Sequence, residues 1–212
     1  MCQVTLHTGR IRLVPLSAEH LEYEVELDSD PEVMRYLGDG RARNRQDVER
    51  RHHRRLAAAK RMAGVGFWVG IVDGQFVSWW ILEPPERVDQ GPVEGQAELG
   101  YRLLRRYWRK GLASEGAREL VRHGFEDLDL TRIFAETMAV NAASRATMAA
   151  VGMQYVRTFH AHWDEPSQAV NWVRSNTRSR SSSGSPPIRA FRKPIGKWCC
   201  PSPACEAGRR GG

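Results

Sequence analysis

The segment from Tyr107 to Phe125, YWRKGLASEGARELVRHGF, combines a strongly amphipathic helix pattern with a glycine where the helix should begin. Its small or apolar positions, spaced three or four residues apart, are Ala113, Ala117, Leu120, Val121, Gly124 and Phe125. The predicted first turn, starting at Gly111, is small and uncharged and follows the cationic pair Arg109 and Lys110. Because the first N–H groups of a helix have no carbonyl partner within it, this turn is suited to bind an anion.

Strand and helix patterns alternate on both sides of this segment. The expected strands are 8–16, 66–72, 75–82, 97–104, 132–139 and 153–163, and the other expected helices are 17–27, 30–38, 44–62 and 142–152. The strands 66–72 and 75–82 flank Asp73-Gly74, a strong hairpin signal, and Asp30-Pro31 is a typical helix start. An opening hairpin followed by alternating strands and helices predicts an α+β or mixed α/β fold around one sheet.

The formal charge of +7 is unevenly distributed along the 212 residues. Residues 167–212 contain nine Lys or Arg and one Glu, so the remaining 166 residues carry a net charge of −1. The net positive charge therefore lies in the tail, and we do not expect the domain to bind nucleic acid. The beginning of the chain has no signal-peptide pattern and no run of residues is apolar enough for a membrane span, so we expect a soluble, cytoplasmic protein.

Metal binding is not expected. The four cysteines, Cys2, Cys199, Cys200 and Cys205, lack paired CxxC spacing. His160 and His162 would share one face of a strand, but no third ligand is evident beside them.

The glycine turn has three competing interpretations. A Walker A loop fails, because Ala117 and Arg118 stand where Lys and Ser or Thr must reach phosphate and magnesium. A dinucleotide fingerprint also fails, because Gly111 and Gly116 do not form G-x-G-x-x-G. A purely structural interpretation, in which Ala113 and Gly116 allow close packing of the helix on the sheet, remains open beside anion binding.

Taken together, the motifs of residues 8–166 resemble the GNAT superfamily of N-acetyltransferases, in particular the branch typified by ribosomal-protein-alanine N-acetyltransferases. The motifs are TGRIRLVPL, DPEVMRYLG, the tryptophan-rich hairpin, WRKGLASE at 108–115 and NAAS at 141–144. The resemblance implies a mostly antiparallel central sheet with a splayed parallel strand pair, flanked by helices. It also implies an enzyme that uses acetyl-CoA as acetyl donor and needs no metal.

The resemblance further implies where acetyl-CoA binds. Its pyrophosphate would lie on the backbone amides of the turn formed by Trp108, Arg109, Lys110, Gly111, Leu112, Ala113 and Ser114. Its pantetheine arm would run between the strands that contain Gly100 and Ala135, with further contacts from Leu103 and Asn141. Many relatives have glycine in place of Arg109, and the wider superfamily often has Gln or Arg in place of Trp108.

By the same resemblance, Glu98 is the candidate base that deprotonates the acceptor amine, although it could be a solvated glutamate at a strand end. Ser144 could donate a proton or a hydrogen bond to the thiolate of the leaving group. Asn141 would contact the cofactor arm, while helix capping alone would also explain it. A backbone amide of Tyr101 or Leu103 would stabilise the oxyanion.

The pKa values of amines limit which class of amine the enzyme is expected to acetylate. Deprotonating a lysine amine with a pKa of about 10.4 costs about 4.6 kcal/mol at pH 7, whereas an α-amine near 7.7–8.0 costs about 1 kcal/mol. The expected acceptor is a protein N-terminal α-amine or a small-molecule amine. The alternative is an inactive or weak acetyl-CoA-binding module of the same fold, which contacts nucleic acid through its basic tail.

Three further expectations concern particular segments. We expect a catalytic domain at 8–173 and a disordered Ser-, Arg- and Pro-rich tail at 174–212, in which SQAVNWVR offers at most a short substitute for a closing strand. A sheet without its last strand would expose an edge and favour self-association, for example as a homodimer. One residue of the pair Trp79 and Trp80 should be in the core and the other in an acceptor groove, while His52 and His53 should face solvent.

Overall fold

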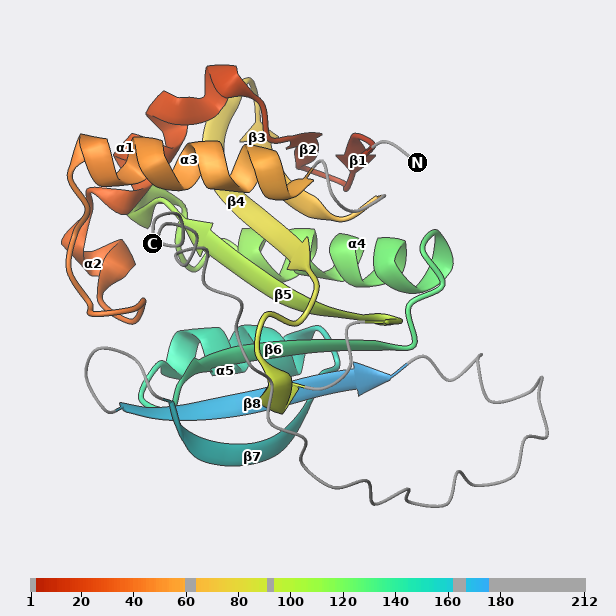
Figure 1. Ribbon diagram of the computed structural model, residues 1–212. Coiled ribbons are helices and arrows are strands. Elements are labelled where there is room, and N and C mark those ends of the chain that lie inside the picture. The colour runs from red at the N-terminus through yellow and green to blue at the C-terminus, as the bar shows by residue number, and fades with distance from the viewer. Residues whose placement is uncertain (1–2, 60–63, 91–93, 162–166, 176–212) are drawn as a thin grey trace, which may run out of the picture. The chain divides into compact units, whose positions relative to one another are not determined.

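The computed structural model describes residues 3–59, 64–90, 94–161 and 167–175 (Figure 1). The chain divides into two units, 1–179 and 180–212, and all described residues lie in the first. The strands of the described part are β1 Leu6–His7, β2 Arg12–Pro15, β3 Gly66–Val72, β4 Gln75–Glu83, β5 Gln96–Leu103, β6 Arg132–Met138, β7 Gln154–Ala161 and β8 Ser167–Ser175. They form one sheet in the order β1-β2-β3-β4-β5-β6-β8-β7, antiparallel except for β5 and β6.

The helices cover both faces of this sheet (Figure 1). The α-helices are α1 Leu21–Asp28, α2 Pro31–Met34, α3 Arg45–Ala59, α4 Leu112–Glu126 and α5 Ala142–Ala150, and the short 3-10 turns are η1 Ala18–His20, η2 Val88–Gln90 and η3 Arg105–Tyr107. One core joins α4 and α5 to one face of the sheet, and a second core joins α1 and α2 to the other. The expected mixed α/β architecture, with a mostly antiparallel sheet and one parallel pair, is confirmed.

Local sequence signals produced the expected turns. Asp73 and Gly74 both have positive φ, 49° and 76°, as a two-residue hairpin requires, and they join β3 to β4. Asp30 caps α2 by accepting a hydrogen bond from the backbone N of Glu32 at 2.9 Å, with Pro31 as the first helical residue.

The two adjacent tryptophans of β4 enter opposite cores, as alternation along a strand requires. Trp80 lies against α4, where a Cβ added to Gly116 would be 2.4 Å from its Cε2 atom. The close-packing interpretation is therefore confirmed for Gly116. Trp79 is only 4% exposed and packs under the helices of the opposite face. The expectation that one tryptophan lines an open groove is wrong, because both faces of the sheet at β4 are covered.

The expectation that His52 faces solvent is also wrong. His52 is 2% exposed, and its Nδ1 lies 2.6 Å from a carboxylate oxygen of the buried Glu24 on α1. Arg55, one helical turn further along α3, donates to the other oxygen of Glu24 at 2.6 Å. The inward face of α3 thus combines apolar side chains, Val48 and Leu56, with polar ones that pair with α1. His53 is exposed, as expected.

The prediction that the sheet lacks its closing strand is wrong. β8 pairs with β6 along seven positions, from Met138↔Ala169 to Arg132↔Ser175, and with β7 on its other side. The segment SQAVNWVR is therefore a full interior strand, which runs past the predicted domain boundary at 173. The homodimer remains a prediction that no longer has the missing strand as support. The first two residues of the expected disordered tail, 174 and 175, belong to β8, and the rest of it lies outside the described residues.

Candidate active site

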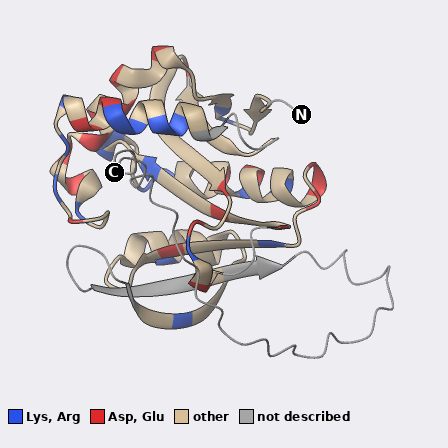
Figure 2. Cartoon of the chain, in the orientation of Figure 1, with Lys and Arg blue, Asp and Glu red and all other residues tan. Residues whose placement is uncertain are grey.

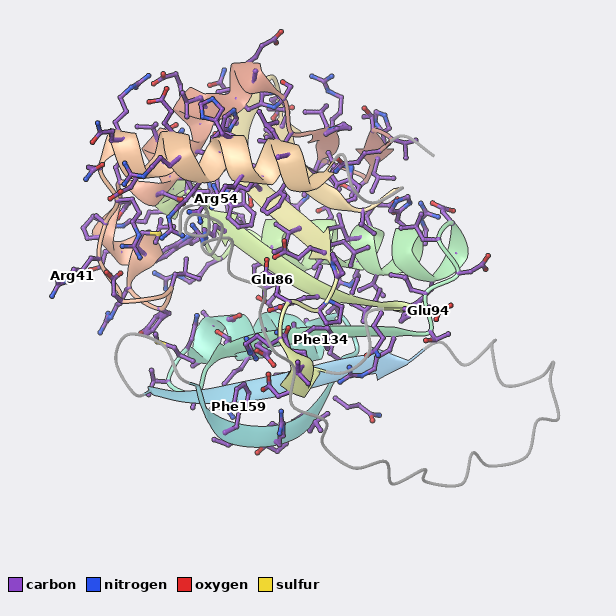
Figure 3. The ribbon with its side chains drawn as sticks, viewed as in Figure 1. Arg41, Arg54, Glu86, Glu94, Phe134 and Phe159 are labelled. Atoms are coloured by element: carbon purple, nitrogen blue, oxygen red, sulfur yellow. The ribbon has the colours of Figure 1, made fainter. Side chains whose placement is uncertain are left out.

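The two parallel strands separate at Glu98. β5 and β6 pair at Gln96↔Arg132, Ala97↔Ile133 and Glu98↔Phe134, and within the described residues their pairing ends there. Beyond this point β5 stays paired with β4, and β6 with β8. Gly100 and Ala135, the positions expected on separated strands, both follow the last pair. Figure 3 labels Phe134 at this point of β6 and Glu86 in the segment that follows β4.

The glycine turn leads directly into α4. Gly111 has φ 76° and ψ 0°, a left-handed conformation that glycine adopts without strain, and Arg109 also has a positive φ of 58°. The first helical hydrogen bond runs from the backbone N of Glu115 to the carbonyl of Gly111 at 3.1 Å. The N–H groups of Leu112, Ala113 and Ser114 precede it and have no carbonyl partner within the helix. This turn therefore fits a phosphate group.

The side chains around the turn are held in different ways. Trp108 is 41% exposed, and its indole N–H donates to the carbonyl of Leu103 at 2.8 Å. The ammonium of Lys110 lies 5.1 Å from the centre of the Tyr107 ring. Leu103 and Leu112 are buried in the core beneath α4, so their side chains are not available to a ligand.

A contact that sequence reasoning missed fixes the turn from outside. The carboxylate of Glu115, in the first turn of α4, accepts hydrogen bonds from Thr8 Oγ1 at 2.6 Å and from the backbone N of Arg10 at 2.9 Å. The guanidinium of Arg10 pairs with the same carboxylate and also donates to the carbonyl of Lys110 at 3.0 Å. The opening TGRIRLVPL motif thus holds the glycine turn in place. The residues it links are too far apart in sequence for their spacing to predict the contact.

Glu98 lies on the face of β5 opposite the core that α4 covers, because its neighbours Ala97 and Leu99 are buried in that core. One of its carboxylate oxygens accepts a hydrogen bond from Gln90 Nε2 at 3.0 Å. Burial raises the pKa of Glu98 to about 8, and the negative charges of Glu136 and Glu83 add to this effect. Glu98 is therefore a partly buried carboxyl group rather than a freely solvated one.

Other acidic residues act on Glu98 through their charge, and Figure 2 colours the acidic positions of the described chain red. Glu83, at the end of β4, is its direct cross-strand partner. Burial, with a contribution from the charge of Glu86, raises the pKa of Glu83 to about 7. On β6, Glu136 pairs with Arg87 at 2.6 Å. A carboxyl group with a pKa near 8 can accept a proton from an amine close to neutral pH, which is the requirement for a general base.

Two hydroxyl groups meet on the other face of β5. The phenol of Tyr101 donates to the carbonyl of Ser144 at 3.1 Å, and its oxygen also lies 3.1 Å from Ser144 Oγ. Burial raises the pKa of Tyr101, so its phenol stays protonated at neutral pH. Asn141 caps α5 by accepting from the backbone N of Ser144 at 3.1 Å, which confirms the capping interpretation. The Tyr101 hydroxyl was missed, although strand alternation places it opposite Glu98.

Two further sequence expectations concern metals and membranes. No group of His, Cys, Asp or Glu that could hold a metal ion occurs among the described residues. His162 and the side chain of His160 lie outside them. Within the same part of the chain, no helix has the length and apolar character needed to cross a lipid bilayer.

Known proteins with similar sequences and folds agree with this arrangement. Residues 10–154 match the family described as acetyltransferase (GNAT) domain. Over 170 residues the chain is 41% identical to the FsC-acetyl coenzyme A-N(2)-transacetylase of Aspergillus fumigatus. This alignment covers 79% of this chain and 72% of that protein.

Two solved structures share the fold. RimL, a ribosomal L7/L12 alpha-N-protein acetyltransferase in complex with coenzyme A, superposes with a TM-score of 0.69 at 12% identity, covering 81% of this chain and 98% of that one. Mycobacterium smegmatis RimJ, in complex with a CoA disulfide, superposes with a TM-score of 0.68 at 18% identity, covering 85% and 89%. The strand separation at Glu98, the glycine turn before α4 and the family match lead to one conclusion: the chain belongs to the acetyltransferase (GNAT) family and is an acetyl-CoA-dependent N-acetyltransferase.

Proposed function

We propose that the protein transfers the acetyl group of acetyl-CoA directly to an α-amine, either of a protein N-terminus or of a small molecule, with Glu98 as general base. The observation that carries the proposal is the position of Glu98, at the last paired residue before β5 and β6 separate. Its raised pKa, caused first by burial, supports the same role. We assign the activity to the domain predicted at 8–173, extended by the last two residues of β8, and none to the tail that follows.

The proposed binding mode of the donor follows from the two features of the fold. The amides that begin α4, together with Trp108, Arg109 and Lys110, would hold the pyrophosphate. The pantetheine arm would pass between β5 and β6 beyond Glu98, near Leu103 and Asn141. This places the thioester beside β5, where an amide of Tyr101 or Leu103 would stabilise the tetrahedral oxyanion.

Proton transfer favours an α-amine over a lysine side chain. An α-ammonium with a pKa of about 7.7–8.0 would pass its proton to Glu98, whose pKa is about 8, with almost no change in free energy. A lysine ammonium, with a pKa of about 10.4, would require about 3 kcal/mol for the same step. The names of the relatives point the same way, since one is an N(2)-transacetylase and another an alpha-N-protein acetyltransferase.

The departing thiolate needs a proton from the opposite side of β5. Ser144 and Tyr101 supply hydroxyl groups there, 3.1 Å apart, and the capped start of α5 holds Ser144 in place. In the proposed reaction Glu98 takes one proton from the α-ammonium, and the neutral nitrogen attacks the thioester carbonyl. The C–S bond then breaks as the sulfur takes a proton from Ser144, and the second proton that leaves the nitrogen restores the Ser144 hydroxyl, so the products are the amide, the free thiol and protonated Glu98.

The test measures thiol release from acetyl-CoA with two matched peptides. One has a free N-terminus and no lysine, and the other has a blocked N-terminus and one free lysine. We expect turnover with the first peptide, and with small α-amines such as amino-acid amides, and a strong loss in Glu98→Gln with little change in acetyl-CoA affinity. Turnover of the lysine peptide alone would contradict the α-amine assignment. Acetyl-CoA binding without turnover of any amine would instead support the alternative of a binding module.

A further inference from the structure

Gln90 is a buried side chain whose amide makes four hydrogen bonds. It is 4% exposed and ends the short turn η2, between β4 and β5. Its Oε1 accepts from the backbone N atoms of Glu86 and Arg87, both at 3.0 Å. Its Nε2 donates to Glu98 at 3.0 Å and to Glu136 at 3.4 Å. The NH2 group of the amide thus donates to two carboxylates, and its oxygen accepts from two backbone N–H groups of the loop.

The backbone of Gln90 is anchored as well. Its carbonyl accepts a hydrogen bond from Arg132 Nη1 at 3.0 Å, on the first residue of β6. One residue therefore joins the β4–β5 connection to both strands of the separating pair. A glutamine is suited to this position, because a carboxylate there could not donate to Glu98 and an ammonium could not accept from the loop.

From these contacts we infer that Gln90 is a positioning residue for the reaction, which orients the carboxylate of Glu98 toward the acceptor and favours its charged form. The inference rests on the proposed function, in which Glu98 is the base. Gln90 does not touch the reacting atoms in this scheme; it acts through Glu98.

The charges that face Glu98 explain why a neutral donor matters. Glu83 on β4 and Glu136 on β6 both disfavour ionisation of Glu98, and burial disfavours it most. The cation of the loop, Arg87, donates its hydrogen bonds to Glu136 and Asp89, and its charge favours ionisation of Glu98 less than the hydrogen bond from Gln90 does. Gln90 opposes these effects by donating to Glu98, so its removal leaves a buried carboxylate among like charges.

Three variants of the full-length protein distinguish an effect of Gln90 on the pKa of Glu98 from a role in holding the β4–β5 connection. Gln90→Met removes all four side-chain hydrogen bonds. Gln90→Glu can still accept from the two loop amides but replaces the neutral donor with an acidic group. Asp89→Asn is the matched control, since Asp89 lies on the same turn and pairs with Arg87 and Arg157 without contacting Glu98.

The first measurement is the pKa of Glu98, obtained by carbon-13 NMR titration of protein labelled in its glutamate carboxyl groups, with the signal assigned from Glu98→Gln. We expect the pKa to rise by about one unit in both Gln90 variants and to stay near the wild-type value in Asp89→Asn. An unchanged pKa in Gln90→Met would overturn the inference, whatever happens to activity.

The second measurement is the pH profile of kcat/KM for acetyl transfer to an α-amine. We expect the limb that rises with pH to move upward by the same amount, which lowers the rate about tenfold at pH 7 in both Gln90 variants. A Gln90 role limited to folding would lower the rate equally at every pH and overturn the inference. If the NMR pKa moves and the profile does not, Glu98 is not the base, and the proposed function fails while the contact between the two residues stands.

Discussion

Arg10 and Glu115 form an ion pair, with 2.6 Å between Arg10 Nη2 and Glu115 Oε2, across 105 residues of sequence. The same guanidinium donates to the carbonyl of Lys110, immediately before the helix start at Gly111. The pair therefore fixes the turn proposed to bind pyrophosphate to the first strands of the sheet. Burial opposes ionisation of Glu115, but hydrogen bonds from Thr8 and Arg10 outweigh it and lower the pKa of that carboxyl group.

This contact predicts a loss of donor affinity when Glu115 is neutralised. In Glu115→Gln the ion pair is gone and the turn is less well positioned, so we expect the Kd for acetyl-CoA to rise about tenfold, equivalent to about 1.4 kcal/mol. Glu119→Gln is the control, because it removes an ion pair with Arg122 from the same helix, away from the turn. Isothermal titration calorimetry compares them, and equal affinities in the two variants would contradict the prediction.

Gly111, which caps the start of α4, and Gly116, which lies within the helix, should respond differently to substitution. Gly111→Val places a branched side chain at a positive φ, with space around it but about 1–2 kcal/mol of backbone strain. We expect the substitution to reduce the free energy of acetyl-CoA binding far more than the free energy of unfolding. Gly116→Ala meets the Trp80 ring at 2.4 Å, so we expect it to lose about 1–3 kcal/mol of stability and to bind acetyl-CoA normally when folded.

Calorimetry and thermal unfolding together decide between these outcomes. Unchanged affinity in a folded Gly111→Val protein would remove the phosphate interpretation of the turn. A Gly116→Ala protein as stable as the wild type would show that α4 can move away from β4.

The hydroxyl pair of Tyr101 and Ser144 should behave as one unit. We expect Tyr101→Phe and Ser144→Ala each to lower kcat, by roughly 10²-fold, with little effect on the Kd for acetyl-CoA. Because the two oxygens lie 3.1 Å apart, the double variant should lose little more than either single variant. Steady-state kinetics of this double-mutant cycle is the test, and fully additive losses would mean that the hydroxyls act independently.

The pair of Glu83 and Glu98 predicts a shift in pH dependence. The charge of Glu83 helps to raise the pKa of Glu98 to about 8, so Glu83→Gln should lower that pKa. A base is active when deprotonated, and the limb of kcat/KM that rises with pH should therefore move to lower pH. Activity at about pH 7, roughly one unit below the wild-type pKa of about 8, should increase as a result. A shift to higher pH, or none, in the measured profile would contradict the proximity effect.

The sequence by itself determined the features that depend on neighbouring residues. Asp73-Gly74 specified a tight hairpin because both positions take positive φ, and Asp30-Pro31 specified a helix start because a cap and a fixed φ act within one turn. The amphipathic period of the α4 segment and the glycine before it could be recognised in the sequence, because they also depend only on neighbouring residues. Together these local signals were enough to predict the mixed α/β fold and the order of most elements.

Only the tertiary structure decided the features that depend on distant partners. SQAVNWVR reads as a short segment at the end of a motif-bearing region, yet as β8 it lies between β6 and β7, where hydrogen bonds on both sides fix it. His52 is buried because Glu24, on another helix, supplies its partner. The pKa of Glu98 likewise depends on burial and on Glu83, Glu136 and Gln90, which three different segments bring to it. Desolvation and charge proximity are properties of the packed chain, so no local pattern in the sequence could set them.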